Sequence, residues 1–236
     1  MELETNPPIA EQVAKRALVL AAIGNRGLIE NEPDEIEDPQ ESCDMMLEWL
    51  DEIGMSDEVE PEEWKVLQRP VNSLEMQTVA NATWRLEGLG VLLWALGVYE
   101  LPSHDDLVVP ADLFDATGIY DNDESLEFLK NATLRSKEDL EKFHTYILML
   151  HWRLREFRLR PQAMDFVEFS EDCWLGSFDV SRFEIIDRDV AIGGKSIINA
   201  NPDLLGLCES IATERHIAAN WLLGEHRLYS QIETHT

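Results

Sequence analysis

A stretch near the middle of the chain, residues 74–99, is apolar on almost every side when it is drawn as a helix. Apolar residues recur along one face at steps of three and four. They are Val79, Ala82, Leu86, Leu89, Leu93 and Leu96. Residues 89–98 carry no charge, and a helix of this kind is buried in a protein core or in a membrane. Because the run is shorter than the ~20 apolar residues of a membrane span, it predicts a buried core helix.

Three other segments show the same periodicity and are expected to pack against this core helix. The first covers residues 9–26 and is rich in alanine and leucine. The second begins after Ser136 and runs to about Leu159, and the third begins after Asn201 and runs to about Gly224. Serine and asparagine are favoured just before a helix, because their side chains accept hydrogen bonds from its first backbone N–H groups.

Residues 178–200 have a different character, since β-branched and aromatic residues replace the helical pattern. Asp187-Arg188-Asp189 and Gly193-Gly194 supply turn signals between the apolar pieces. A strand pair alone is marginal in water, so these strands must pack on the helices. The sequence therefore predicts a mainly α protein: a single helical domain over residues 1–236 around the buried central helix, with a small β-hairpin or meander near residues 178–200.

Acidic residues are concentrated in residues 30–63, which contain sixteen Asp and Glu and no Lys or Arg. Apolar residues among them indicate a helix over residues 41–53 with an acidic outer face, and we interpret the segment as an elaboration of the domain. The whole chain has a formal net charge of −28. This charge disfavours nucleic acids and anionic membranes and is compatible with a basic protein partner. Solubility or a salty habitat would explain the same charge without a partner.

The three cysteines, Cys43, Cys173 and Cys208, lie far apart and form no C-x-x-C pair. An odd number of scattered cysteines favours reduced thiols over a disulfide framework or a zinc site. The first residues, MELETNPP, are acidic and lack the basic and apolar regions of a signal peptide. We therefore expect a cytoplasmic protein, and the sequence leaves its oligomeric state open.

Polar side chains interrupt the apolar pattern of three predicted helices. Arg85 and Glu87 are two residues apart, so they do not face each other, and each needs a partner from another element if it is buried. The candidate polar cluster comprises Arg85, Glu87, His151, Arg153, Arg155, Glu214, Arg215, His216 and Asn220. We expect these residues to converge between the helices, either as ion pairs that lock the helices together or as the lining of a ligand pocket.

The chain lacks G-x-S-x-G, H-E-x-x-H, a P-loop and G-x-G-x-x-G, so no known catalytic signature is present. His144 and His151 share a helix face, but no third metal ligand is identifiable, and the acidic segment lacks the calcium-loop signature. We therefore expect no metal and no cofactor. One basic cluster ends the second long helix, and we expect it to pair with part of the acidic half, with phosphate or partner binding as the alternative. Its members are Arg153, Arg155, Arg158 and Arg160.

Several of these stretches resemble motifs of an uncharacterised bacterial family, domain of unknown function 4272. W-R-x-E-x-L at residues 84–89, with W-A-L-G at residues 94–97, resembles its central motif. H-W-x-x-R at residues 151–155 and E-R-x-x-A-x-N-W-L at residues 214–222 resemble its later motifs. The segment from Arg16 to Leu20 resembles its opening, so the resemblance covers most of the chain from near Ile9. Where the family usually ends in T-D-T, this chain has Thr234-His235-Thr236.

The resemblance implies a mostly helical, cytoplasmic protein and carries no established activity. With the composition, it leads us to expect a non-catalytic interaction or regulatory protein with a strongly acidic surface, binding a basic protein partner. The alternative is an enzyme or small-molecule receptor built on the polar cluster. In that case an open cleft should be lined by Arg85, Glu87, His151, Arg155, Glu214 and His216.

Overall fold

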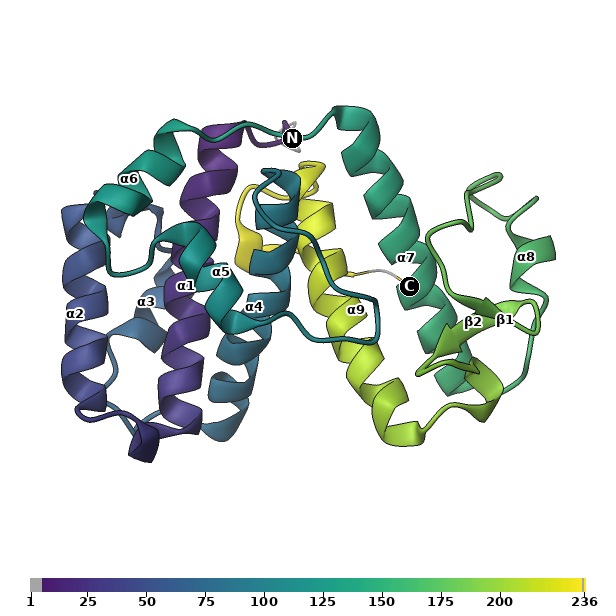
Figure 1. Ribbon diagram of the computed structural model, residues 1–236, viewed down its shortest axis with the longest axis horizontal. Coiled ribbons are helices and arrows are strands. Elements are labelled where there is room, and N and C mark those ends of the chain that lie inside the picture. Colours follow the sequence, from purple (N-terminus) through teal and green to yellow (C-terminus); the bar gives the residue numbers. More distant parts are fainter. Residues whose placement is uncertain (1–5, 235) are drawn as a thin grey trace.

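A long helix, α4, stands at the centre of the computed structural model, which describes residues 6–234 and 236. α1 packs on one side of α4 and α9 on the other, with α7 next to α9 (Figure 1). These four helices are α1 (Ala10–Asn31), α4 (Met76–Ala95), α7 (Lys137–Leu159) and α9 (Pro202–Leu222). The mainly helical fold predicted around a buried central helix is confirmed. No described helix is both long enough and apolar enough to cross a membrane.

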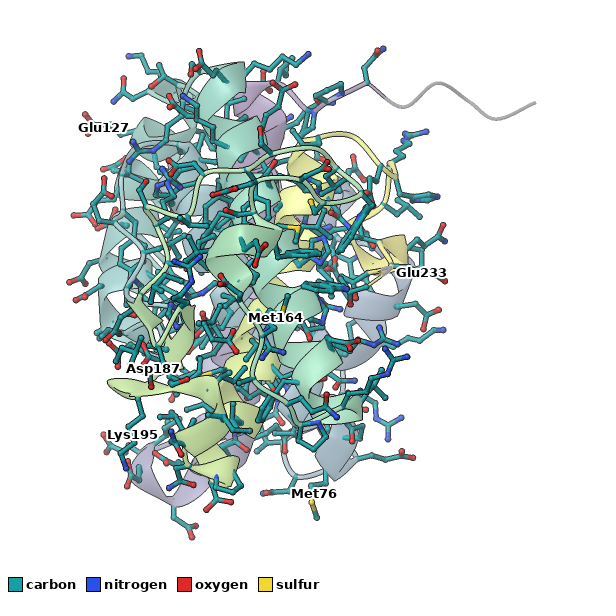
Figure 2. All side chains as sticks on the ribbon, turned by 90° about the vertical axis from the view of Figure 1, so that its right-hand side faces the viewer. Met76, Glu127, Met164, Asp187, Lys195 and Glu233 are labelled. Carbon is teal, nitrogen blue, oxygen red and sulfur yellow. The ribbon has the colours of Figure 1, made fainter. Side chains whose placement is uncertain are left out.

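The two ends of α4 lie in different surroundings. Its first turn reaches the edge of the molecule, where Met76 projects outward and is 87% exposed (Figure 2). Its second half, residues 86–95, is buried. The helix then stops because Gly97 has a left-handed conformation (φ +75°) and the N–H of Val98 donates to the carbonyl of Leu93 (3.1 Å). The apolar pattern continues beyond this point, so the helix predicted over residues 74–99 was too long at its C-terminal end.

Two glycines allow α1 and α4 to cross closely. A Cβ atom added to Gly24 would lie within 3.0 Å of the Leu86 side chain. One added to Gly27 would lie within 3.0 Å of the backbone of Thr83. Because glycine has no Cβ, these two positions let the backbones of α1 and α4 approach closely.

The acidic segment folds into a layer against α1. Its elements are η1 (Pro33–Glu35), α2 (Pro39–Glu52), η2 (Ser56–Glu58) and α3 (Pro61–Leu67). Asp38 starts α2, because its side chain accepts a hydrogen bond from the N–H of Glu41 (2.9 Å). Met46 and Trp49 of α2 pack with Val19 of α1 in a second hydrophobic cluster. The apolar residues spaced among the acids thus anchor α2 to the helical core.

Two short helices, α5 (Pro110–Thr117) and α6 (Asn122–Lys130), also pack near α1 and α2. The sequence analysis predicted no helix over residues 110–117, so α5 was missed. Pro110 begins it, and Gly118 ends it in a left-handed conformation (φ +65°). The indole N–H of Trp49 donates to the hydroxyl of Ser125 (3.2 Å), which joins α6 to α2.

A three-stranded antiparallel meander lies beside α7 (Figure 1). Its strands are β1 (Ile185–Ile186), β2 (Asp189–Ile192) and β3 (Lys195–Ser196), with α8 (Phe166–Phe169) before them and η3 (Ile197–Asn199) after. Ile185 pairs with Val190, and Ala191 pairs with Ser196. Both two-residue turns have positive φ at both positions, which tight hairpins of this kind require. The predicted small meander is confirmed, and all of β2 is buried.

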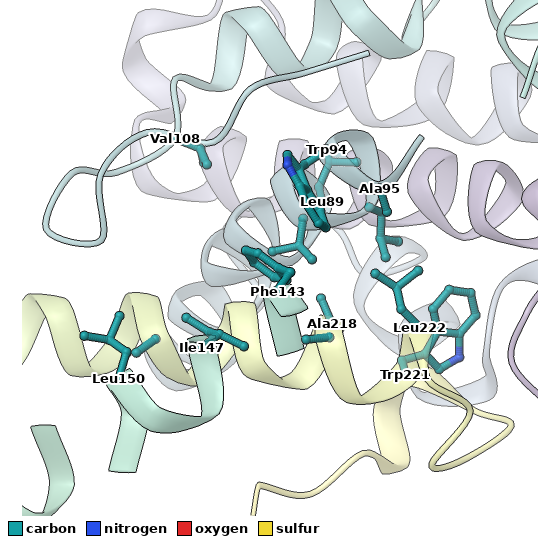
Figure 3. Close-up of a cluster of buried hydrophobic side chains, with 14 of the residues drawn as sticks. Leu89, Trp94, Ala95, Val108, Phe143, Ile147, Leu150, Ala218, Trp221 and Leu222 are labelled. Carbon is teal, nitrogen blue, oxygen red and sulfur yellow. The ribbon is translucent and has the colours of Figure 1, made fainter. Parts of the chain in front are cut away.

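The main hydrophobic core fills the space between α4, α7 and α9 (Figure 3). Trp94 of α4 lies against Phe143 of α7, with ring centroids 4.4 Å apart, and Ala218 and Leu222 reach the same core from α9. The C-terminal tail then folds back through η4 (Tyr229–Gln231). The acidic first residues 1–5 and His235 lie outside the described residues.

Candidate functional site

Two neighbouring ion pairs join α4 to α9. Arg85 bonds to Glu214 (2.9 Å), and Glu87 bonds to Arg215 (2.8 Å). The Glu87–Arg215 pair is sealed, with side chains only 2% and 3% exposed, whereas the Arg85–Glu214 pair keeps some contact with solvent. Burial raises the pKa of the Glu214 carboxyl, although Arg85 opposes that shift. The two-residue spacing on α4 is thus matched by adjacent residues on α9.

Arg215 is also the anchor of the loop between α4 and α5. Its guanidinium donates to the carbonyls of Pro102 (3.3 Å), Ser103 (3.1 Å) and Asp106 (2.9 Å). The second carboxylate oxygen of Glu87 accepts a hydrogen bond from the N–H of Val108 (2.9 Å). Burying two charges costs several kcal/mol per ion unless further hydrogen bonds satisfy them, and this loop supplies those bonds.

Arg153 forms no ion pair with the other charged residues of the predicted cluster, all of which the structure describes, and it binds the meander. It forms a two-pronged contact with Asp189, through Nε (2.8 Å) and Nη2 (2.6 Å), and both side chains are 1% exposed. Asp189 also accepts the backbone N–H groups of Met164 (3.0 Å) and Val190 (2.9 Å). The Arg153–Asp189 pair therefore fixes β2 and the segment after α7 to the end of α7.

The expectation that the basic cluster of α7 pairs with the acidic half of the chain was wrong, because its ion-pair partners among the described residues all lie in the second half. Arg158 bonds to Glu209 of α9 (2.8 Å), and Arg160 bonds to Glu156 of its own helix (3.3 Å). The physical reason is distance, because α2 and α7 lie on opposite sides of the molecule with α1, α4 and α9 between them (Figure 1).

Two buried histidines link α7 to α9. The Nδ1 atoms of His151 and His216 are 3.1 Å apart, and Nε2 of His151 lies 3.2 Å from the hydroxyl of Thr213. That hydroxyl donates to the carbonyl of Glu209 (2.7 Å), so His151 must donate from Nε2. Nδ1 of His151 then accepts the proton of His216. Burial, as the main cause, lowers the pKa of His151 to about 4 and that of His216 to about 3, so both rings are neutral at pH 7.

This pair predicts a loss of stability in mild acid. Between about pH 6.5 and pH 4 the unfolded chain binds protons that the folded imidazoles refuse, so the free energy of unfolding falls as the pH falls. Relative to the double variant His151→Gln/His216→Gln, the native protein should lose about 2–4 kcal/mol of unfolding free energy from pH 7 to pH 5. Urea denaturation at both pH values measures this difference. Identical pH dependence in the two proteins would show that the rings titrate normally.

The last two predicted residues hold the C-terminal tail against α7 and α9. Asn220 accepts a hydrogen bond from Nε2 of His144 (2.9 Å) and donates to the carbonyl of Glu233 (3.1 Å). Arg155 donates to the hydroxyl of Thr236 (3.4 Å). Burial lowers the pKa of His144, so this contact also uses a neutral ring.

Sequence reasoning missed a third buried network, centred on Arg16 of α1. Arg16 bonds to Glu60 (2.8 Å) and Glu63 (2.7 Å), and Glu60 also accepts the backbone N–H groups of Tyr229 (2.7 Å) and Ser230 (3.1 Å). It thus ties together α1, α3 and the tail. An arginine three residues after Val13, within an apolar stripe, was the available signal.

Arg26 of α1 is a second buried charge that the sequence reasoning passed over. Its guanidinium bonds to Glu30 and donates to the sulfur of Cys43 (2.7 Å) and to the carbonyl of Pro70 (3.2 Å). Its side chain is fully buried. This network holds α2 and the segment between α3 and α4 to the C-terminal part of α1.

The nine predicted residues therefore form several separate contacts. A pocket of about 390 Å³ takes only Arg215 from this set, and a second pocket of about 570 Å³ takes none of them. Over residues 6–234 and 236, no group of three or more His, Cys, Asp or Glu is placed to hold a metal ion. These side chains act mainly on one another and on the backbone, and the geometry is that of internal ion pairing.

A comparison with protein-family models finds a match over most of the chain. Residues 2–167 match the model of the family described as Domain of unknown function (DUF4272). The chain belongs to this family. No curated protein and no solved structure matches it.

The DUF4272 match contains all but one of the stretches that resemble the family's motifs. W-R-x-E-x-L and H-W-x-x-R lie within residues 2–167, while E-R-x-x-A-x-N-W-L on α9 lies beyond them. The two α4–α9 ion pairs therefore connect the matched DUF4272 region to the C-terminal part of the chain.

Proposed function

We propose that this DUF4272 protein is a non-catalytic cytoplasmic interaction protein, and that the acidic face of α2 binds a basic protein partner. This α2 face is defined by five exposed carboxylates at helical spacing. They are Glu41, Asp44, Glu48, Asp51 and Glu52. Met45 on the same helix is 51% exposed and offers apolar contact area.

One observation carries the proposal. Within residues 6–234 and 236, none of the five carboxylates of the α2 face forms an ion pair, whereas Glu30, Glu60 and Glu63 of the same acidic segment are paired inside the protein. The inward carboxylates are thus neutralised by internal arginines, and the α2 face keeps its charge. The negative electrostatic field of these uncompensated carboxylates speeds and orients the approach of a cationic partner.

The neighbouring helix α6 extends the same field. The side-chain amide of Asn122 donates to Glu52 (2.6 Å), which places the start of α6 beside α2. α6 adds exposed carboxylates of its own, and Glu127 points outward at the edge of the molecule (Figure 2). A location in the cytoplasm is supported by three free thiols, at Cys43, Cys173 and Cys208.

Binding of a basic peptide to charge-neutralised variants tests the proposal. In the α2 variant, all five carboxylates of the face become amides: Glu41→Gln, Asp44→Asn, Glu48→Gln, Asp51→Asn and Glu52→Gln. A 20-residue lysine-rich peptide should bind this variant at least ~10-fold more weakly than the native protein at ~50 mM salt, and ~500 mM salt should abolish the difference. Fluorescence anisotropy of the labelled peptide measures both effects.

A matched control separates local from overall charge. It carries five amide substitutions on exposed acids around α8, the meander and the start of α9: Glu168→Gln, Glu171→Gln, Asp172→Asn, Asp187→Asn and Asp203→Asn. Its affinity for the peptide should stay within ~2-fold of the native value. Equal weakening in both variants would mean that net charge alone attracts the peptide, and the α2 face would then have no special role.

A further inference from the structure

A pocket of about 390 Å³ opens between the C-terminal end of α4, the loop after it, α7 and the segment before β1. It is independent of the α2 face. Trp94, Phe143, Tyr146 and Phe183 line it, together with the charged residues Arg182 and Glu184. This volume lies within the range of small-molecule sites.

An aromatic wall runs along the pocket. Trp94 and Phe143 have ring centroids 4.4 Å apart, Phe143 and Tyr146 lie 6.1 Å apart, and Tyr146 and Phe183 lie 4.8 Å apart. Trp94, Phe143 and Phe183 are each at most 6% exposed, so packing holds their rings in place. A wall of this kind suits an apolar or aromatic group.

Several polar groups at this pocket have no hydrogen-bond or ion-pair partner in the described part of the chain. The hydroxyl of Tyr146 makes no hydrogen bond there, and burial raises its pKa to about 12, so it stays a donor at neutral pH. Arg182 and Glu184 are exposed, and neither forms an ion pair with a described residue. The guanidinium of Arg182 lies 6.0 Å from the ring centre of Trp94, which places a positive charge over the aromatic wall.

The other charges that line the pocket are already engaged. Arg215 is bound to Glu87 and to loop carbonyls, and Glu100 is bound to Arg135 (2.6 Å). Among the described residues that line the pocket, one cation and one carboxylate therefore remain without an ion pair, at Arg182 and Glu184. A ligand with only one sign of charge would leave one of them without a counterpart.

We propose that this pocket binds a small zwitterion of the amino-acid type. Its carboxylate pairs with Arg182 and the hydroxyl of Tyr146, its ammonium pairs with Glu184, and its apolar or aromatic side chain lies on Trp94 and Phe143. A carboxylate held by a guanidinium and a hydroxyl is a charge-assisted contact, which is stronger than a neutral hydrogen bond.

Three related probes test the assignment on the full chain by isothermal titration calorimetry. Phenylalanine carries both charges, 3-phenylpropanoate lacks the ammonium, and phenethylamine lacks the carboxylate. Phenylalanine should bind at least ~10-fold more tightly than either fragment, because each charge finds an opposite one. Affinity of phenylalanine no better than that of the better fragment overturns the zwitterion, and no binding of any probe at ~10 mM overturns the site.

Exposed variants then assign each charge without disturbing the core. Arg182→Gln should weaken the binding of phenylalanine and 3-phenylpropanoate at least ~10-fold and leave that of phenethylamine unchanged. Glu184→Gln should weaken the binding of phenylalanine and phenethylamine at least ~10-fold and leave that of 3-phenylpropanoate unchanged. Arg188→Gln is the matched control, since Arg188 is exposed on the same segment but bonds to Asp165 outside the pocket. Native affinity in Arg182→Gln and Glu184→Gln, or equal weakening in the control, contradicts the proposed pairing. The α2 variant should bind phenylalanine normally, which keeps this test separate from that of the basic partner.

Discussion

Replacing Glu87 with alanine should lower the free energy of unfolding by about 3–5 kcal/mol. The guanidinium of Arg215 would remain in a dry interior without its carboxylate, since the native pair is only 2–3% exposed. The N–H of Val108 would also lose its acceptor, which adds the cost of a buried unsatisfied donor. Urea denaturation monitored by circular dichroism measures the loss.

A solvent-exposed ion pair supplies the control for the Glu87→Ala experiment. Glu138→Ala removes a carboxylate from the exposed pair with Lys142 (2.6 Å), whose side chains are 75% and 62% exposed, and should cost less than ~1 kcal/mol. Similar small losses in Glu138→Ala and Glu87→Ala would mean that the inter-helix pair behaves as a surface pair.

Replacing Gly88 with alanine is expected to be the most damaging single-methyl change on α4. An added Cβ would lie within 3.0 Å of the hydroxyl oxygen of Tyr229, which is buried and has no hydrogen-bond partner among the described residues. Overpacking of this kind costs about 1–3 kcal/mol, which outweighs the ~1 kcal/mol that alanine contributes as a better helix former. Thermal and urea denaturation should both show the loss.

Two further variants separate the clash from other effects. In a Tyr229→Phe background the hydroxyl is gone, and the nearest ring carbon would lie 3.4 Å from the new Cβ, so Gly88→Ala should become nearly neutral. Gly206→Ala on α9 meets no atom within 4 Å and should stabilise the protein by about 0.5–1 kcal/mol. An equal cost of Gly88→Ala in the tyrosine and phenylalanine backgrounds would rule out the hydroxyl as its cause.

Much of the fold was predictable because its signals are local. The uncharged apolar run at residues 89–98 indicated a buried central helix, and the second half of α4, residues 86–95, is buried. Paired turn residues before and after β2 indicated the meander, because few residues adopt positive φ. The true end of α4 was missed because the apolar pattern runs past Gly97, whose left-handed conformation ends the helix.

The partners of buried charges were harder to predict than the need for them. Two-residue spacing showed that Arg85 and Glu87 need separate partners, and the structure supplies both from α9. Spacing could not show that Arg153 would turn to Asp189, because the chain has 47 Asp and Glu and only the tertiary fold selects among them. The network of Arg16 was missed for the same reason, since its acceptors lie more than forty positions away on a different element.

The central claim is that Glu87 and Arg215 neutralise each other in the dry interface between α4 and α9. A double-mutant cycle with Glu87→Ala, Arg215→Ala and the double variant tests it most directly, using unfolding free energies from urea titrations. We predict a coupling energy of at least ~2 kcal/mol, with the double variant far less destabilised than the sum of the two single variants. A coupling energy below ~0.5 kcal/mol would contradict a buried ion pair at this position.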